Sequence, residues 1–218
     1  MKILTAGNKN FKPLILKSLE KIKEFNYESV VYDLGGLGFG KEFKVDKKDF
    51  NRPRIQPVPA TFKPKIIKDC LSNMKKDRTL VYLDGDAFLM KNIDEIEYDN
   101  YDVGITVRTE HEVKKYKNYR PKGSINSGVI FLRNTKSAME FIDTWINKAL
   151  EENSDQVSLN SLLGDCVDVL KYDQTVRKDR LKVKLFRTTV YNNYYPNFDT
   201  DKTKIRHLKG STMKKEFL

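Results

Sequence analysis

The sequence predicts a single α/β domain with a mixed, mainly parallel central sheet of Rossmann-like type. Short apolar runs of β type alternate with amphipathic helical patterns through the first half of the chain, an order that builds parallel sheets. The 218 residues are enough for one domain with a full core. Because no internal repeat or low-complexity tract divides the chain, we expect one domain.

The first half is expected to consist of strand and helix units. Apolar residues such as Leu14, Ile15 and Ile22 recur at the helical spacing of about 3.6 residues. A glycine-rich segment, 34–40, follows the second strand. In chain order we expect a strand, a helix, a strand and a helix at Lys2–Ala6, Phe11–Phe25, Ser29–Asp33 and Lys63–Met74, and then a strand that begins at Leu80 and stops at the carboxylates of Asp84 and Asp86.

The second half is less regular. A helical pattern places Trp145 on an apolar face, which predicts a core position, and Ser154 or Asp155 is expected to cap the next helix. Asn126–Gly128 reads as a turn at the head of a strand, and 111–122 as a basic loop. The expected strands are Tyr101–Val107, Ile125–Leu132, Leu181–Phe186 and Thr203–Leu208, and the expected helices are Thr135–Leu150 and Asp155–Leu163.

Composition limits the partners and the compartment. The chain has 41 Lys+Arg against 30 Asp+Glu, a formal charge of +11, which favours anionic partners without choosing among them. Two isolated cysteines, Cys70 and Cys166, argue against a disulfide framework or a cysteine-rich zinc site. No apolar stretch approaches the ~18 residues of a membrane span, and the amino terminus lacks the apolar core of a signal peptide. We expect a cytoplasmic location.

An apolar run that ends in two carboxylates is the most informative local feature. Leu80–Phe88 delivers Asp84 and Asp86, separated by Gly85, to the carboxyl end of a buried strand. Ionised carboxylates suit a hard divalent cation such as Mg²⁺ or Mn²⁺, and the glycine allows a phosphate to approach. A solvated Asp-Gly turn is the alternative interpretation.

Other polar groups follow the ends of the neighbouring strands. Thr5, Ala6, Gly7 and Asn8 come after the first strand, Asp33 after the second and His207 after the last. In open α/β sheets, ligands bind beyond the carboxyl ends of the strands. The alternative for a single histidine is a hydrogen-bonded structural role. Together these groups predict a ligand site at one edge of the sheet.

Five motifs in chain order resemble a known family. They are Leu4–Asn8, Asp84–Asp86, Asn126–Phe131, Asp155–Asn160 and His207–Gly210. This order resembles the nucleotide-sugar-dependent glycosyltransferases of the GT-A fold with a DxD motif, in particular the retaining, glycogenin-like and galactosyltransferase-like group. The resemblance covers 1–210, and we interpret 211–218 as a C-terminal tail or a linker to further domains.

The resemblance implies a donor site for a nucleoside diphosphate sugar, with UDP favoured. Asp84, Asp86 and His207 would ligate Mn²⁺, with Mg²⁺ as second choice, and Asp84 would also contact the ribose. A loop and one carboxylate would hold the base and ribose, and three lysines are candidates for the diphosphate. These donor-binding candidates are Thr5, Ala6, Gly7, Asn8, Asp33, Lys63, Lys65, Gly85, Lys209 and Gly210.

Asp33 and the lysines among the donor-binding candidates have plainer alternatives. Asp33 could serve only a turn at a strand end, and any single lysine in so basic a chain is by default a solvated surface residue. The chain also departs from the family, because Met213 stands where relatives often have a lysine.

The same resemblance implies that Asn126, Asp155 and Gln156 face the transferred sugar. If the enzyme inverted configuration, Asp155 would be the candidate base; if it retains, no dedicated protein base is required. Helix capping is the alternative role for Asp155. The acceptor, a glycan or another hydroxyl compound, is not specified by the sequence.

Two other function classes compete with this interpretation. A haloacid-dehalogenase-type phosphatase also places an aspartate pair after an apolar strand, but its pattern requires Thr or Val where Phe88 stands. A nucleic-acid-binding module is suggested by the net charge and by the run Lys114–Lys117. Because no nucleic-acid motif appears, we expect no nucleic-acid partner and, from charge alone, at most weak contact with an anionic membrane surface.

Overall fold

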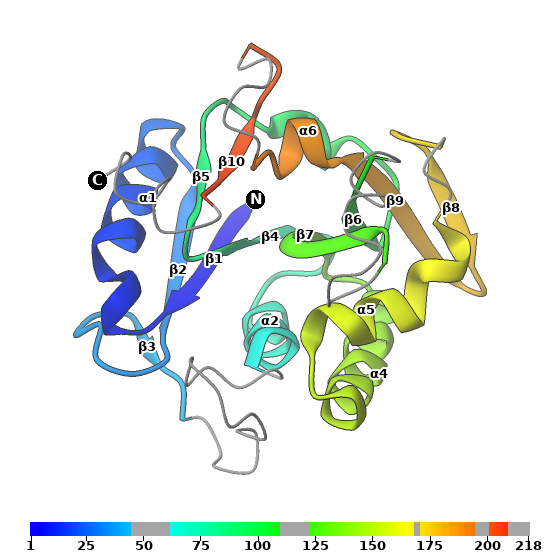
Figure 1. The fold of residues 1–218 in the computed structure, drawn as a ribbon, viewed down its shortest axis with the longest axis horizontal. Helices are drawn as coiled ribbons and strands as arrows, with labels where there is room; N and C mark the ends of the chain where they lie inside the picture. Colours follow the sequence, from blue (N-terminus) through cyan, green and yellow to red (C-terminus); the bar gives the residue numbers. More distant parts are fainter. Residues whose placement is uncertain (45–61, 110–122, 168–170, 195–200, 209–218) are drawn as a thin grey trace.

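A mixed eight-stranded sheet forms the centre of the computed structural model, which describes residues 1–44, 62–109, 123–167, 171–194 and 201–208. The strand order is β3-β2-β1-β4-β7-β6-β9-β8 (Figure 1). The pairs β3/β2, β2/β1, β1/β4 and β6/β9 are parallel, and the other three pairs are antiparallel. The predicted mixed, mainly parallel α/β architecture is therefore confirmed.

The strands and helices have the following bounds. The sheet contains β1 Lys2–Gly7, β2 Glu28–Asp33, β3 Lys41–Glu42, β4 Thr79–Asp84, β6 Val103–Val107, β7 Ile125–Arg133, β8 Thr175–Lys178 and β9 Leu181–Arg187, and a separate antiparallel pair joins β5 Ala87–Leu89 to β10 Ile205–His207. The α-helices are α1 Lys12–Glu24, α2 Phe62–Ser72, α4 Lys136–Glu152, α5 Asp155–Leu163 and α6 Thr188–Tyr191. Short 3₁₀ turns lie at η1 Lys9–Phe11, η3 Asp94–Glu97 and η4 Gly164–Cys166.

Helices cover both faces of the sheet. Helices α2, α4 and α5 pack against one face and α1 against the other (Figure 1). Because side chains alternate along a strand, Leu4 joins the core under α2 and α4, whereas its neighbour Ile3 joins the core under α1. Trp145 of α4 is fully buried in the first of these cores, as predicted. None of the helices in the described part of the chain is long and apolar enough to cross a membrane.

Local capping explains how α5 begins. Asn153 adopts a left-handed conformation with φ 51° at the end of α4 and reverses the chain there. The Ser154 hydroxyl then accepts a hydrogen bond from the Val157 backbone N–H at 3.3 Å, so Ser154 is the N-cap and Asp155 is the first helical residue. Asn160 fixes the helix on β7, because its side chain accepts from Ile125 N at 2.9 Å and donates to Ile125 O at 3.1 Å.

One local prediction is wrong. Asn126, Ser127 and Gly128 form no turn at the head of a strand but lie within β7, where Thr106 of β6 pairs with Asn126. The register shifts between Ile105, which pairs with Ile130, and Thr106, so that 127–129 of β7 lie between the two pairs in a bulge-like irregularity. The expected basic loop at 111–122 lies outside the described residues. The short elements β3, β5, β8 and α6 were not predicted.

Candidate metal and sugar-nucleotide site

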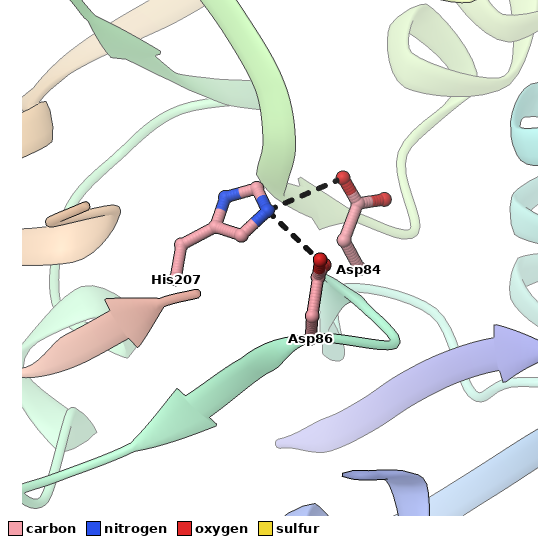
Figure 2. A group of neighbouring side chains, drawn as sticks. All are labelled: Asp84, Asp86 and His207. Atoms are coloured by element: carbon pink, nitrogen blue, oxygen red, sulfur yellow. Dashed lines mark ion pairs between the residues drawn. The ribbon is translucent and has the colours of Figure 1, made fainter. Parts of the chain in front are cut away.

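Three potential metal ligands converge beyond the end of β4. Asp84 is the last residue of β4, Asp86 follows in the turn to β5, and His207 ends β10. Strand β10 pairs with β5 so that His207 lies opposite Ala87, and Leu208 N donates to Asp86 O at 2.8 Å. One ligand atom from each side chain lies within 4.8 Å of the others. We call these three residues the Asp-Asp-His group (Figure 2).

The geometry of the Asp-Asp-His group suits a divalent cation. His207 Nε2 lies 3.2 Å from Asp86 Oδ1 and 3.9 Å from Asp84 Oδ2. Two ligands at right angles around an ion with bonds of about 2.1 Å are about 3 Å apart, so these separations are close to what one shared ion needs. Two carboxylates and one imidazole form a donor set that fits Mn²⁺ or Mg²⁺.

A glycine lets the sheet approach this group closely. A Cβ atom on Gly128 of β7 would lie 2.4 Å from His207 Cε1 and 3.1 Å from Asp84 Oδ2. The first of these distances is shorter than real Cβ contacts essentially ever are. The imidazole therefore occupies the space that any larger residue at position 128 would need.

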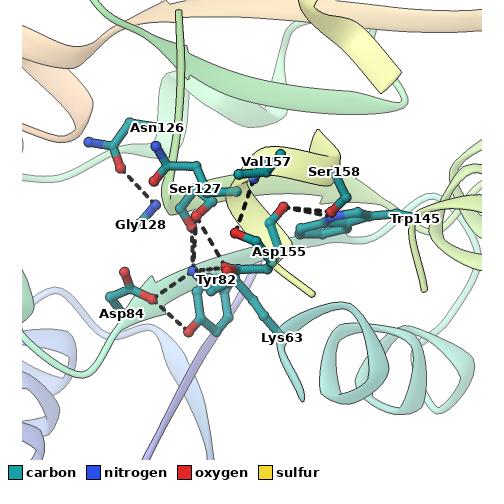
Figure 3. Close-up of polar contacts among 12 residues, drawn as sticks. Lys63, Tyr82, Asp84, Asn126, Ser127, Gly128, Trp145, Asp155, Val157 and Ser158 are labelled. Carbon is teal, nitrogen blue, oxygen red and sulfur yellow. Dashed lines mark hydrogen bonds and ion pairs between the residues drawn. The ribbon is translucent and has the colours of Figure 1, made fainter. Parts of the chain in front are cut away.

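A buried lysine lies on the other side of Asp84. Lys63 of α2 is 4% exposed, and its Nζ lies 2.8 Å from Asp155 Oδ2 and 3.1 Å from Asp84 Oδ1 (Figure 3). The same Nζ donates to Ser127 O at 2.9 Å and to Ser127 Oγ at 3.2 Å. Lys63, Asp84, Ser127 and Asp155 form what we call the Lys63 cluster. Burial by itself would lower the pKa of Lys63, but the carboxylates of Asp155 and Asp84 outweigh it and raise the pKa.

Asp84 belongs to both groups and divides its two oxygens between them. Oδ1 faces Lys63 and accepts a hydrogen bond from the Tyr82 hydroxyl at 2.8 Å. Oδ2 faces His207. Burial and the neighbouring Asp84 carboxylate raise the pKa of Tyr82 well above its usual value, which keeps the phenol a donor. One carboxylate oxygen is thus held by the protein while the other points to the Asp-Asp-His group.

The three residues expected at the sugar are assembled by β7 and α5. Asp155 Oδ2 accepts from Ser127 Oγ at 3.2 Å in addition to its ion pair with Lys63. Asn126 Oδ1 accepts from Gly128 N at 3.0 Å. The side-chain amide nitrogens of Asn126 and Gln156 are buried and have no hydrogen-bond partner within the described residues. Buried donors without a partner are rare in folded proteins, and a ligand could satisfy them.

The first-strand residues lie at the same sheet edge as Asp84. In the parallel register, Ala6 pairs with Asp84 and Gly7 with Asp33. Asn8 caps η1, accepting from Asn10 N at 3.0 Å through Oδ1. Thr5 is fully buried. The structure therefore brings this loop beside the DxD carboxylates, and its contact with a nucleotide stays a prediction.

Asp33 has a structural role in its own loop. Its carboxylate accepts hydrogen bonds from the backbone N–H groups of Gly35 at 2.7 Å, Leu37 at 3.1 Å and Gly38 at 3.2 Å. Desolvation would raise the pKa of Asp33, but these backbone donors outweigh it and lower the pKa. The strand-end turn that was the alternative interpretation is present, and a nucleotide contact remains a prediction.

The structure gives less support to the remaining donor-binding candidates, which are Lys65, Gly85, Lys209 and Gly210. Lys65 lies on α2 two residues beyond Lys63, and residues two apart on a helix do not share a face. Gly85 is packed close to the protein itself, since a Cβ there would lie 3.0 Å from Ala6 O and 3.2 Å from a Phe11 ring carbon. Lys209 and Gly210 lie outside the described residues.

Several site residues were not found from the sequence. Tyr82, Ser127 and Gly128 lay inside motifs that were quoted for other residues, and Asn192 was not singled out at all. Asn192 Oδ1 lies 2.8 Å from His207 Nδ1 in a fully buried position. No local pattern distinguishes this asparagine, because only the pairing of distant segments brings it to the histidine.

A family comparison covers most of the chain. A family model described as nucleotide-diphospho-sugar transferase matches residues 35–215. No curated protein matches the sequence.

Solved structures share the fold at low identity. A glycosyltransferase involved in glycosylation of the major capsid of PBCV-1 aligns with a TM-score of 0.62 and 13% identity over 100% of this chain and 98% of its own. The galactosyltransferase LgtC, solved with donor and acceptor sugar analogs, aligns at 0.57 and 16% over 96% and 87%. GlyE of Streptococcus pneumoniae aligns at 0.55 and 15% over 94% and 53%. At such identities the likeness shows the fold, which is GT-A.

Proposed function

The chain belongs to the nucleotide-diphospho-sugar transferase family, and from this premise we propose a metal-dependent glycosyltransferase that takes a sugar from a UDP-sugar and retains its configuration. Family membership makes the protein a sugar-transferring enzyme with a nucleotide-sugar donor and a sugar acceptor. The phosphatase and nucleic-acid alternatives are therefore set aside.

The observation that carries the proposal is the convergence of the Asp-Asp-His group. Three ligand atoms from β4, the following turn and β10 lie within 4.8 Å of one another at the carboxyl edge of the sheet. Nucleotides bind at this edge in open α/β sheets. A divalent ion held there, with Mn²⁺ favoured over Mg²⁺, would neutralise the charge that develops on the departing nucleoside diphosphate.

The chain's own residues would hold the rest of the donor. Thr5, Ala6, Gly7 and Asn8 border the edge beside Asp84 and are proposed to contact the base and ribose through backbone groups. Asp33 is proposed to contribute mainly by shaping its loop, since three backbone donors already engage its carboxylate. Lys63, Lys65 and Lys209 remain proposals for the diphosphate, and Gly85 and Gly210 remain proposals for contacts with the donor, by resemblance.

The sugar is proposed to lie against β7 and the start of α5. The buried amide donors of Asn126 and Gln156 would each gain an acceptor from a sugar hydroxyl, which removes the cost of a buried unpaired N–H. Asp155, the first residue of α5, is held beside them by Lys63 and Ser127. These contacts would orient the sugar during transfer.

The contacts of the Asp155 carboxylate favour retention. An inverting enzyme needs a carboxylate to take the proton of the acceptor hydroxyl, and Asp155 is the candidate. In the structure, Asp155 Oδ2 is engaged by both Lys63 Nζ and Ser127 Oγ. This leaves one oxygen for other contacts and fits a residue that positions the donor better than it fits a base.

The proposal can be tested with the purified protein. Thermal-shift measurements with UDP-, GDP- and ADP-sugars, each with and without Mn²⁺, should show stabilisation by a UDP-sugar that depends on metal, because a ligand of the native state stabilises it by mass action. Slow release of UDP from that donor should also depend on Mn²⁺. Stabilisation by another nucleotide alone would contradict the UDP assignment.

A single substitution tests the metal role. Asp86→Asn should reduce metal-dependent donor cleavage by roughly 100-fold or more, equivalent to about 3 kcal/mol of lost transition-state stabilisation. Without metal, the Asp86→Asn variant should melt at no lower a temperature than the metal-free parent, since removing one of two adjacent carboxylates relieves their repulsion. Asp143→Asn is the matched control, because Asp143 is an exposed carboxylate paired with Lys68 on the helical face. Equal turnover of Asp86→Asn and the parent at saturating Mn²⁺ would refute metal-dependent transfer.

A further inference from the structure

A buried chain of hydrogen bonds runs from the backbone of β7 to the ring of His207. The Thr106 hydroxyl lies 3.0 Å from the Asn126 carbonyl oxygen, Asn192 Nδ2 lies 2.8 Å from Thr106 Oγ1, and Asn192 Oδ1 lies 2.8 Å from His207 Nδ1. All four residues are at most 4% exposed. Solvent therefore does not compete for these bonds.

The chemistry of the first group gives the chain a direction. A backbone carbonyl can only accept, so the Thr106 hydroxyl donates its single proton to Asn126 O. Its oxygen is then free to accept from the Asn192 amide, which turns Asn192 Oδ1 towards His207. A carbonyl oxygen needs a donor, so this contact places a proton on Nδ1, while Nε2 faces the Asp86 carboxylate at 3.2 Å, where the proposed cation would stand in place of a proton.

The reverse direction is disfavoured by burial. If Asn192 presented its NH₂ group to His207, Thr106 would have to donate to Asn192. The Asn126 carbonyl would then lose its hydroxyl donor in a fully buried position, at the cost of an unmade hydrogen bond.

We propose that Asn192 and Thr106 are positioning residues that keep the proton on Nδ1 of His207 and so present the lone pair of Nε2 to the ion. The inference rests on the metal role of His207 in the proposed function. Second-shell hydrogen bonds of this kind set the tautomer and ring orientation of metal-binding histidines. With the proton on Nδ1, the Nε2 lone pair faces Asp86 Oδ1 at 3.2 Å, an arrangement that a cation between them stabilises.

The backbone holds both partners in place. Asn192 N donates to Thr188 O at 2.9 Å at the end of α6, Asn193 N donates to Ile205 O at 2.9 Å, and His207 N donates to Asn193 O at 2.8 Å. The asparagine and the histidine are thus tied to each other through main-chain bonds as well as through their side chains. Small shifts of either residue are resisted, which a precise metal ligand requires.

The tautomer can be measured directly in the metal-free parent protein. The chain has two histidines, His111 and His207, so ¹⁵N spectra of the imidazole rings contain two sets of signals that His111→Gln assigns. With the pH raised until the ring is neutral, the proposal expects an N–H signal for His207 Nδ1 and an unprotonated signal for Nε2. An unprotonated Nδ1 overturns it.

Metal affinity supplies the second measurement. Mn²⁺ alone, followed by electron paramagnetic resonance, should bind the Asn192→Leu variant about 10- to 100-fold more weakly than the parent. Asn192→Asp keeps an acceptor on Nδ1 and should restore most of the affinity, and Thr106→Val should show a smaller loss than Asn192→Leu. Thr79→Val is the control, because Thr79 is an equally buried threonine of the sheet that takes no part in the hydrogen bonds leading to His207.

The outcomes separate this inference from the proposed function. Unchanged Mn²⁺ affinity in a folded Asn192→Leu variant overturns the positioning role. If that variant does not fold, the ring spectrum of the parent decides. Normal tautomer and metal affinity without any sugar transfer would contradict the glycosyltransferase proposal and leave the positioning role supported.

Discussion

The Asp-Asp-His group and the Lys63 cluster share Asp84 but neutralise their carboxylates differently. In the Lys63 cluster, a buried ammonium lies within 3.1 Å of both Asp84 and Asp155, so the protein supplies the counter-charge itself. In the Asp-Asp-His group, two carboxylates face an imidazole. The first arrangement is complete without a ligand, whereas the second is suited to an added cation.

The formal charges of the Asp-Asp-His group and the Lys63 cluster, taken together, do not cancel. Asp84, Asp86 and Asp155 contribute three negative charges and Lys63 one positive charge, which leaves two negative charges when His207 is neutral. A divalent ion would balance this sum. Asp84 supplies the carboxylate that the two groups share.

Removing the internal cation should have the largest effect on stability. Lys63→Met leaves Asp84 and Asp155 without their buried partner and should lower the free energy of unfolding at pH 7 by about 3 kcal/mol. Urea denaturation measures the change. Lys68→Met is the matched control on the same helix, because its ion pair with Asp143 is exposed and should contribute less than about 1 kcal/mol. A Lys63→Met variant as stable as Lys68→Met would show that the cluster is not held by this charge.

Filling the space beside His207 should disturb the Asp-Asp-His group. Gly128→Ala places a Cβ 2.4 Å from His207 Cε1, so the ring must move, and the expected cost is about 1–3 kcal/mol of stability with a clear loss of Mn²⁺ affinity.

Gly104→Ala separates overpacking from metal binding. A Cβ at Gly104 of β6 would lie 2.5 Å from Phe186 Cε2, in the core and not at the ligands. This control should destabilise the protein to a similar degree while its Mn²⁺ affinity, measured on the folded fraction, stays at the parent value. Equal affinity losses in the two alanine variants would contradict the direct effect on His207.

The smallest effect is expected at Asp33, whose carboxylate is held mainly by backbone N–H groups, with a smaller contribution from the charge of Lys12. Its pKa is lower in the folded protein, so its stabilising contribution is complete above the unfolded pKa of about 3.9 and is lost as the pH falls through the folded value. Asp33→Ala should therefore lower stability slightly at pH 7, by less than about 1 kcal/mol. Below about pH 4 the difference from the parent should shrink. Urea denaturation at both pH values checks this, and a difference that grows in acid would contradict it.

Much of the fold follows from patterns along the chain. The long helices and the buried strands have clear periodicity, and their predicted bounds agree with the structure to within a few residues. The short elements β3, β5, β8 and α6 were missed, since segments of two to four residues carry too little pattern. Asn126–Gly128 was misassigned because turn-forming residues also occur at a bulge within a strand.

The site residues also divide into those that the sequence reveals and those that only the fold reveals. Asp84 and Asp86 are recognisable because a nine-residue segment contains both the buried strand and the carboxylates that end it. Lys63 was singled out as a diphosphate candidate, but its burial between Asp84 and Asp155 was not predicted, and Asn192 lies in no recognisable motif. Both depend on contacts between residues that are far apart along the chain.

Local patterning was thus enough to establish the α/β class, most of its elements and the acidic pair at the end of β4, because apolar periodicity and turn chemistry act over a few residues. The pairing of β10 with β5, the burial of Lys63 between two carboxylates and the hydrogen-bond chain to His207 were settled only when the chain folded. The physical reason is that strand register and buried polar partners are selected by long-range packing, where each unpaired group is costly.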